Sequence, residues 1–351
     1  MFKTNNSTIN WLLENDNPPV KYLTYLKILD MNPNSSKIIS AKNEIMTYKP
    51  IKEILMNQIE ETYWFDKGKT KNYKKYLGTF WQLIFLSEMQ AEKNKQIANA
   101  CEHVFSTGQA PNGAFSMSGT NSQSIICLTA NVLRALIHFN YLEDDRTQKA
   151  LEYILSSFVD TNGKIRCQVM GLFENCYMTI PKILFALSAM PEKKRTPRVN
   201  KGIDLCVKRL LDNQIYIYLP EKTNEWRKLV EEKKLKGQEY ADEKKNFIQK
   251  HSPLKKKPKV GWTKFRFPLN NSDALDAMRA LVSANVEYSS EMESSIELII
   301  SKNQNGKWLN EKEYRSPFYT IIEPINSESK WLTLHALITL KHFIGIEILD
   351  H

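Results

Sequence analysis

A chain of 351 residues, with 42% hydrophobic and 11% aromatic residues, is long and apolar enough to bury a sizeable core, which excludes a mainly disordered protein. Its longest apolar run is interrupted by Lys341 and His342, so no run reaches the roughly 18 to 20 residues of a membrane span. The net charge of +10 is concentrated in residues 221–259, which hold thirteen Lys or Arg against seven Asp or Glu.

The beginning of the chain and its cysteines both point to a reducing compartment. Residues 1–10 are polar and rich in Asn, without the basic and apolar regions of a secretory signal, so we expect a cytoplasmic protein. The cysteines are odd in number and widely spaced, which favours reduced thiols over a disulfide framework. They are Cys101, Cys127, Cys167, Cys176 and Cys206.

An Asn-Gly turn recurs along the chain, each time after an apolar helical stretch. It occurs in Gln109–Phe115, Asp160–Ile165 and Asn303–Trp308. The first two glycines are 50 residues apart, and the third follows after 143 residues, close to three periods. Two weaker copies, Leu55–Trp64 and Leu210–Tyr218, lack the glycine but keep the aromatic end. A period of about fifty residues predicts a repeat architecture.

Short, almost wholly apolar helices are expected between these turns. In chain order they are Tyr22–Leu29, Phe80–Met89, Val132–Phe139, Ile183–Met190, Ala277–Ala284 and Thr333–Leu340. Helices that combine charges with an apolar stripe alternate with them, at Asn94–Ser106, Arg146–Ser157, Pro197–Asp212 and Glu291–Ser301. Because a helix that is apolar all round belongs inside and an amphipathic helix faces water, we expect an inner and an outer layer of helices.

One charged stretch interrupts the period between the fourth and fifth inner helices. Residues 219–258 contain opposite charges at i, i+4 spacing but few apolar anchors, which predicts a solvated, partly frayed helix. The segment His251–Val260 is expected to run extended between its two prolines. We therefore expect residues 219–258 to form a charged insertion that protrudes from the body.

The turn pattern Gln-x-x-x-Gly-x-Trp/Phe after a helix resembles a degenerate form of the repeat of squalene cyclases and protein prenyltransferase beta subunits, over roughly residues 50–343. The resemblance implies an all-α fold, an α/α toroid of about six helical hairpins in two concentric layers. Residues 1–351 would form one such domain, with residues 219–258 inserted in it. An open superhelix of the same hairpins has the same spacing, so spacing alone leaves both arrangements open.

In proteins of that family the substrate enters a central cavity lined by the first turns of the inner helices and the loops before them. The resemblance therefore implies an apolar, isoprenoid-type substrate. The candidate substrate-binding residues are Trp81, Phe85, Cys127, Glu174, Cys176, Tyr177, Trp262, Phe265, Phe267, Trp331 and His335. Aromatic walls can stabilise carbocations by cation–π attraction, and the same side chains also suit a filled core.

A class II terpene cyclase, one enzyme class that the resemblance implies, protonates its substrate through a D-x-D-D motif, which this sequence lacks. Asp273 and Asp276 are the only carboxylates that open an inner helix, and they are the candidate catalytic residues. One turn apart, they share a helix face. The alternative is that Asp273 caps the helix and Asp276 stabilises its first turn.

A protein prenyltransferase, the other enzyme class implied, holds zinc through an Asp-x-Cys pair and a His. Here Leu275 stands where the cysteine would be, and His335 lies in the middle of its expected helix. The spacing between Cys167 and Cys176 is not a usual zinc motif either. We expect no metal and no cofactor.

A non-catalytic scaffold is the alternative function, with a protein or anionic partner bound to its concave face or its basic insertion. Charges in the insertion alternate in sign until Lys255–Lys259, as on a solvated surface, and Trp262–Leu269 suits re-entry into the core better than base stacking. We therefore expect no nucleic-acid binding. The possible partners that the sequence leaves open are an apolar small molecule, another protein and the surface of a membrane.

Overall fold

The computed structural model describes residues 1–68, 71–165, 176–218, 223–251, 256–268, 272–312 and 317–350. These residues are mostly helical, as predicted, and the strands in them form only short two-stranded sheets. The first half contains α1 (Asn6–Leu12), α2 (Pro18–Leu23), α3 (Ser36–Glu44), α4 (Lys49–Met56), α5 (Thr79–Glu88), α6 (Lys95–Gly108), α7 (Ile126–His138) and α8 (Asp145–Ile154). The second half contains α9 (Ile180–Ser188), α10 (Pro197–Leu211), α11 (Thr223–Lys233), α12 (Gly237–His251), α13 (Ala274–Ser283), α14 (Glu293–Ser301) and α15 (Lys330–Ile344). π-Helical turns, Thr24–Ile28 and Leu155–Val159, continue α2 and α8.

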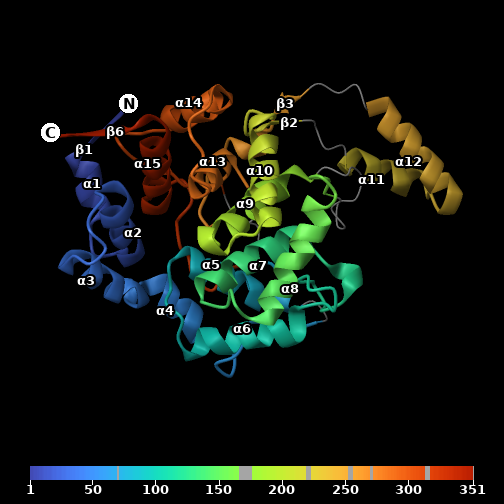
Figure 1. Ribbon diagram of the computed structural model, residues 1–351, viewed down its shortest axis with the longest axis horizontal. Helices are drawn as coiled ribbons and strands as arrows, with labels where there is room; N and C mark the ends of the chain where they lie inside the picture. Colours follow the sequence, from blue (N-terminus) through green and yellow to red (C-terminus); the bar gives the residue numbers. More distant parts are fainter. Residues whose placement is uncertain are drawn as a thin grey trace.

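The predicted inner helices pack against one another in sequence. Helix α5 contacts α7, α7 contacts α9, α9 contacts α13, α13 contacts α15, and α15 contacts α2 (Figure 1). Every residue of α9 is buried, and so is nearly all of α5. The amphipathic helices α6, α8, α10 and α14 each pack against an inner helix that precedes them in the chain. The alternation of apolar and amphipathic helices therefore follows the sequence pattern.

Helix starts are set by polar side chains just before the first turn. Asn94, Asp144, Thr196, Asp273 and Ser329 each accept a hydrogen bond from a backbone N–H two or three residues further on. Such caps satisfy donors that the helix itself leaves free, and they fix where each helix begins.

The repeat is visible as a contact that recurs at three turns. The backbone N–H groups of Trp64, Phe115 and Trp308 donate to the hydroxyl groups of threonines on α5, α7 and α15. Those threonines are Thr79, Thr129 and Thr333, at 3.1, 2.9 and 3.0 Å. Each bond joins a turn, at its aromatic residue, to the inner helix that follows it.

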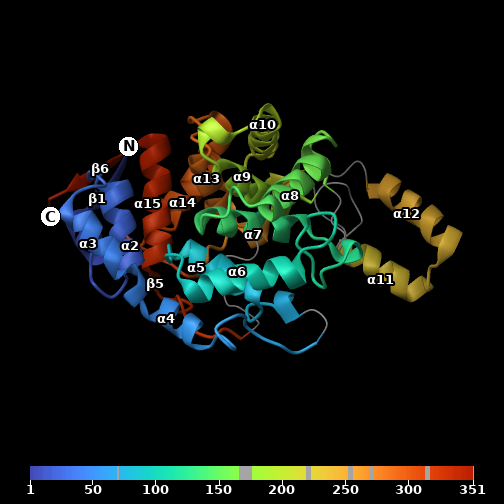
Figure 2. The ribbon, with the colours of Figure 1, turned by 60° about the horizontal axis from the view of Figure 1, so that its bottom comes forward.

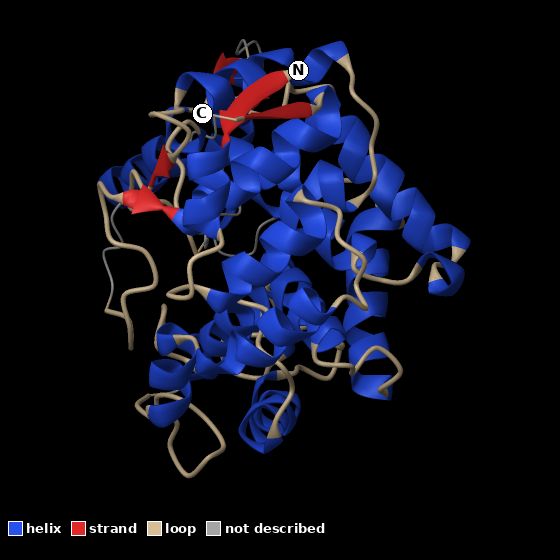
Figure 3. Ribbon diagram, turned by 90° about the vertical axis from the view of Figure 1, so that its left-hand side faces the viewer, coloured by secondary structure: helices blue, strands red, loops and turns tan. Residues whose placement is uncertain are grey.

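The two ends of the chain meet in a parallel sheet. Strand β1 (Phe2–Asn5) pairs with β6 (Ile346–Leu349), so that Phe2 lies opposite Ile346 (Figures 1 and 3). Helix α15 contacts both α2 and β1, so the first helices pack beside the last one. Strands β4 (Trp308–Leu309) and β5 (Glu328–Ser329) form a second, antiparallel pair at the start of α15.

The charged segment forms a helical hairpin that stands apart from the other helices in both views (Figures 1 and 2). The sequence predicted one frayed helix, whereas the structure has two, α11 and α12, with Gly237 in a left-handed conformation at the turn. Trp226 and Phe247 bury each other in a small hydrophobic cluster of the hairpin's own. At its base, β2 (Ile217–Tyr218) pairs with β3 (Lys257–Pro258).

Candidate functional site

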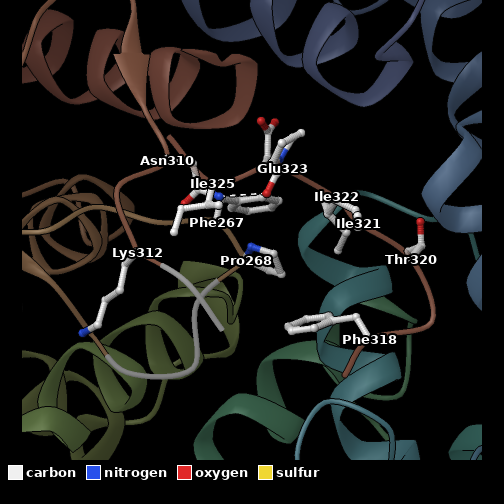
Figure 4. Close-up of a pocket in the computed structure, with 11 residues that line it drawn as sticks. Phe267, Pro268, Asn310, Lys312, Phe318, Thr320, Ile321, Ile322, Glu323 and Ile325 are labelled. Atoms are coloured by element: carbon white, nitrogen blue, oxygen red, sulfur yellow. Dashed lines mark hydrogen bonds between the residues drawn. The ribbon is translucent and has the colours of Figure 1, made fainter. Parts of the chain in front are cut away.

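A cavity of about 430 Å³ lies where the segments that precede α13 and α15 come together (Figure 4). Its lining is mainly apolar and comes from residues 267–268, 310, 312, 318 and 320–325. Small-molecule sites in proteins commonly have volumes of roughly 300–1,000 Å³ and this kind of lining. The cavity therefore has the size and chemistry of a site for a small apolar ligand.

One wall of the cavity is an aromatic stack that begins with Phe267. Its ring lies parallel to the indole of Trp331, 4.4 Å away, and 5.4 Å from the imidazole of His335. Trp331 and His335 lie one turn apart at the start of α15, so α15 positions both rings. Burial, with Arg279 and Arg134 nearby, lowers the pKa of His335 well below its usual value, so the imidazole is neutral at pH 7.

The opposite wall is built around Phe318. Its ring stacks on Tyr76 at 4.6 Å and on Phe85 at 5.5 Å. Trp81 packs edge-on against Tyr76 and donates its Nε1–H to the carbonyl oxygen of Tyr73. Helix α5 thus supports this wall through the two residues, Trp81 and Phe85, that the sequence singled out.

Polar contacts hold the loop around Glu323 that lines the cavity. The side-chain amide of Asn310 donates to the carbonyl oxygen of Glu323 at 2.8 Å (Figure 4). The backbone N–H of Trp331 donates to the Glu323 carboxylate at 3.3 Å. Burial raises the pKa of Glu323 to about 7, against the opposing effects of the hydrogen bonds from Trp331 and Ser329. In Figure 4 this carboxylate points away from Phe318 and Pro268.

Asp273 and Asp276 are both almost completely buried at the start of α13. Asp273 caps the helix by accepting a hydrogen bond from the N–H of Asp276 at 2.8 Å. Its other oxygen, Oδ2, accepts no hydrogen bond from the described part of the chain. Burial and the neighbouring Asp276 raise the pKa of Asp273 to about 8, so this carboxyl holds a proton at neutral pH. Neither residue is among those that line the cavity.

Asp276 belongs to a charged network between the inner helices. Its carboxylate lies 3.6 Å from Arg279, which also reaches Glu88 on α5 at 3.4 Å. Glu88 forms an ion pair with Arg134 on α7 as well. Burial raises the pKa of Asp276 more than Arg279 lowers it. For Glu88, Arg134 and Arg279 outweigh the effect of burial and lower the pKa.

The other residues that the sequence predicted do not line the cavity, and some lie outside the residues that the structure describes. Tyr177 packs on Trp262 with ring centres 5.2 Å apart and donates its hydroxyl to Ile215. Cys176 accepts a hydrogen bond from Thr179, and Phe265 is buried under Lys302. Cys127 is half-buried in the first turn of α7. Glu174 and Cys167 lie outside the described residues.

The sequence did not single out Phe318, Tyr76, Lys312 or Glu323. Phe318 and Glu323 lie in a segment without helical or strand periodicity, which gave no signal that it folds over a cavity.

No metal site is evident in the described ranges, where no group of three or more His, Cys, Asp or Glu side chains converges. The described helices also include none that is long and apolar enough to cross a bilayer.

Comparisons with known proteins give a distant structural likeness. No family model matches the sequence, and no curated protein does so. Among solved structures, the chain is similar to the type II terpene cyclase MstE from Scytonema, determined in complex with its product merosterolic acid A. The two share 12% identity, the alignment covers 86% of this chain and 96% of that chain, and the TM-score is 0.36. This likeness is too distant to identify the fold or the function of the chain.

Proposed function

We propose that this protein is a terpenoid cyclase-like or prenyltransferase-like toroid that binds an apolar, isoprenoid-type molecule in the cavity between Phe267 and Phe318. The observation that carries the proposal is the aromatic, mainly apolar cavity formed by the segments that lead into α13 and α15. In this proposal, the series of inner helices that runs from α5 through α7, α9, α13 and α15 to α2 forms a ring.

Binding of farnesol, measured by the quenching of tryptophan fluorescence, tests this proposal. We expect Phe318→Ala to weaken binding by about tenfold or more, because burial of a phenylalanine side chain is worth about 1.5–3 kcal/mol. Phe247→Ala is the matched control, since it removes a ring of the same kind from the hairpin cluster far from the cavity. Absence of binding, or equal losses in the two variants, would contradict the proposal.

We further propose that, if the bound molecule is also transformed, it extends beyond the residues that line the cavity to the Asp273 and Asp276 pair, which supplies the proton. Oδ1 of Asp273 is sufficient for the cap, so Oδ2 is free to carry the proton. Addition of that proton to a carbon–carbon double bond gives a cation, and loss of a proton elsewhere gives an isomer of the substrate. Asp273→Asn keeps the cap but removes the acid. It should abolish isomer formation, followed by mass spectrometry, and leave farnesol binding unchanged.

Partner binding is a second candidate function, favoured by the separate helical hairpin. Helices α11 and α12 carry many lysines, and their hydrophobic cluster does not depend on the main core. Binding of anionic vesicles or of a polyanion that is lost when residues 222–254 are removed would support this function. Equal binding by the intact and the shortened protein would exclude it.

A further inference from the structure

A groove of about 490 Å³ runs between the two helices of the charged hairpin, and all the residues that line it belong to α11 and α12. The hairpin stands apart from the other helices in Figures 1 and 2, so this groove lies outside the body of the fold. Leu229, which lines the groove, is half-buried. Helices of 11 and 15 residues are marginally stable in water unless one face packs against another surface. The groove therefore presents a face that a further packing partner would stabilise.

The residues that line the groove form one stripe on each helix. Counted from Glu225 on α11 and from Glu243 on α12, they are at positions i, i+3, i+4, i+7 and i+8. Side chains at this spacing share one face of a helix. Leu229 and Phe247 occupy the same position, i+4, in the two stripes. This is the spacing with which helices pack along a common seam.

Charges in the groove are balanced. Apart from His251, its charged side chains are three glutamates and three lysines. A polyanion or an anionic membrane is attracted by an excess of positive charge, which these six side chains do not provide. A face that alternates acids and bases instead suits a second face on which the same charges run in the opposite order.

Each stripe is complementary to its own reverse. On α11, Lys228 precedes Leu229 and Glu232 follows it. When two copies of this helix lie antiparallel about Leu229, the lysine of one copy faces the glutamate of the other. On α12, Glu243 precedes Phe247 and Lys250 follows it, so the same reversal brings opposite charges together. Both helices therefore carry the charge pattern of an antiparallel pair of identical segments.

The hairpin holds the centres of the two stripes at the same level. The rings of Trp226 and Phe247 lie 5.3 Å apart, and Lys233 forms an ion pair with Glu243 at 2.7 Å. These two contacts enclose Leu229 on α11 and residues 243–247 on α12, so Leu229 lies level with that stretch. One two-fold axis can thus cross both stripes near their centres, as an interface between identical surfaces requires.

We propose that this groove binds the same groove of a second copy of the chain, with α11 against α11 and α12 against α12 in antiparallel pairs. The two-fold axis passes close to Leu229 and Phe247, the apolar centre of a four-helix arrangement. Lys228 of each copy faces Glu232 of the other, and the acid and base of α12 meet in the same way. This dimer does not depend on the proposed function, because the cavity lies in another part of the chain.

Sedimentation equilibrium of the full chain measures the dimer, which we expect at micromolar concentration. Lys228→Glu and Glu232→Lys should each weaken the dimer by about tenfold or more, because each creates two contacts between like charges across the axis. Lys245→Glu is the control. It makes the same change of charge at an exposed position of α12 that does not line the groove, and it should alter the dissociation constant by less than about twofold.

A mixture of the two weakened variants separates a lost contact from a folding defect. When Lys228→Glu pairs with Glu232→Lys, every glutamate again faces a lysine, so an equal mixture should form dimers about as tightly as wild type. A wild-type chain that stays monomeric, a mixture that stays monomeric, or a dimer that persists without residues 222–254 would overturn the inference. Farnesol binding, measured on the same samples, should be unchanged in all variants, so a failure of the proposed function is detected separately.

Discussion

At the scale of single residues, two aspartates that both cap the start of a helix differ in their surroundings. Asp144 and Asp273 each cap a helix through one carboxylate oxygen. Hydrogen bonds from Arg146 lower the pKa of Asp144, whereas burial raises the pKa of Asp273 to about 8. The backbone geometry of a cap therefore does not determine its charge, which depends on what packs around the helix end.

The raised pKa of Asp273 predicts how stability depends on pH. The folded protein retains a proton that the unfolded chain has lost, so the free energy of unfolding should fall as the pH rises from about 4 to 8. Asp273→Asn keeps a good cap without the ionisable group. Chemical denaturation should find that the stability of this variant relative to wild type increases from about pH 4 to about pH 8.5, because only wild type loses stability over that range.

Asp144→Asn is the control, for which the expected pH dependence of stability has the opposite sign. The lowered pKa of Asp144 stabilises the fold at neutral pH, and this contribution is lost as the pH falls through the folded-state pKa. The Asp144→Asn substitution should therefore reduce stability at pH 7 and make no difference at about pH 2. If both variants respond to pH in the same way, the difference in burial between the two caps is not what sets their pKa values.

At the scale of elements, one acid joins three helices. Glu88 ends α5 and contacts Arg134 on α7 and Arg279 on α13. The Arg134 guanidinium also lies over the Phe185 ring on α9, 4.1 Å from its centre. The network thus links α5 to α13, which are not neighbours in the series of inner helices, and it couples helices that are distant in the chain.

Glu88→Gln should therefore weaken the fold more than the loss of an exposed ion pair does. Among the described residues, removal of the carboxylate leaves Arg134 without an ion-pair partner and Arg279 with Asp276 alone, at an expected loss of about 2–4 kcal/mol in the free energy of unfolding. Glu143→Gln, which removes an exposed ion pair with Lys194, should change it by less than about 1 kcal/mol. Thermal and urea unfolding measure both losses. Similar small values would show that water already screens the network.

The sequence could predict those elements whose pattern lies within one short segment, but not the contacts between residues that are far apart in the chain. The helix Ile183–Met190 was predictable because its apolar residues run without interruption, and the structure has α9 at Ile180–Ser188. The cap at Asp273 was predictable as an alternative from the residue type alone. The contact between Glu88 and Arg279 was not, because it joins residues 191 positions apart. Neither was the wall at Phe318, whose segment has no periodic pattern to place it.

At the scale of the whole molecule, one contact recurs at three of the turns. Three turns donate a backbone N–H to a threonine on the next inner helix, and Trp64 and Trp308 each also donate their indole N–H to the carbonyl of the preceding helix. The turns at Trp64 and Trp308 are thereby joined to the helix before them and to the helix after them, whereas the turn at Phe115 is joined in this way to the following helix. An insertion between two repeats can then be accommodated, provided that its ends lie close together.

The ends of the charged hairpin do lie close together, because Tyr218 pairs with Lys257 in the sheet at its base. Replacing residues 222–254 with a short Gly-Ser turn should therefore leave a cooperative unfolding transition and a melting temperature within a few degrees of wild type. The physical reason is that Trp226 and Phe247 pack in their own cluster, so that, among the described residues, the deletion removes no side chain from the main core. Calorimetry of the two proteins measures this. A broad, non-cooperative transition in the shortened protein would show that the hairpin is part of the folding unit, and would make residues 219–258 a structural element instead of an insertion.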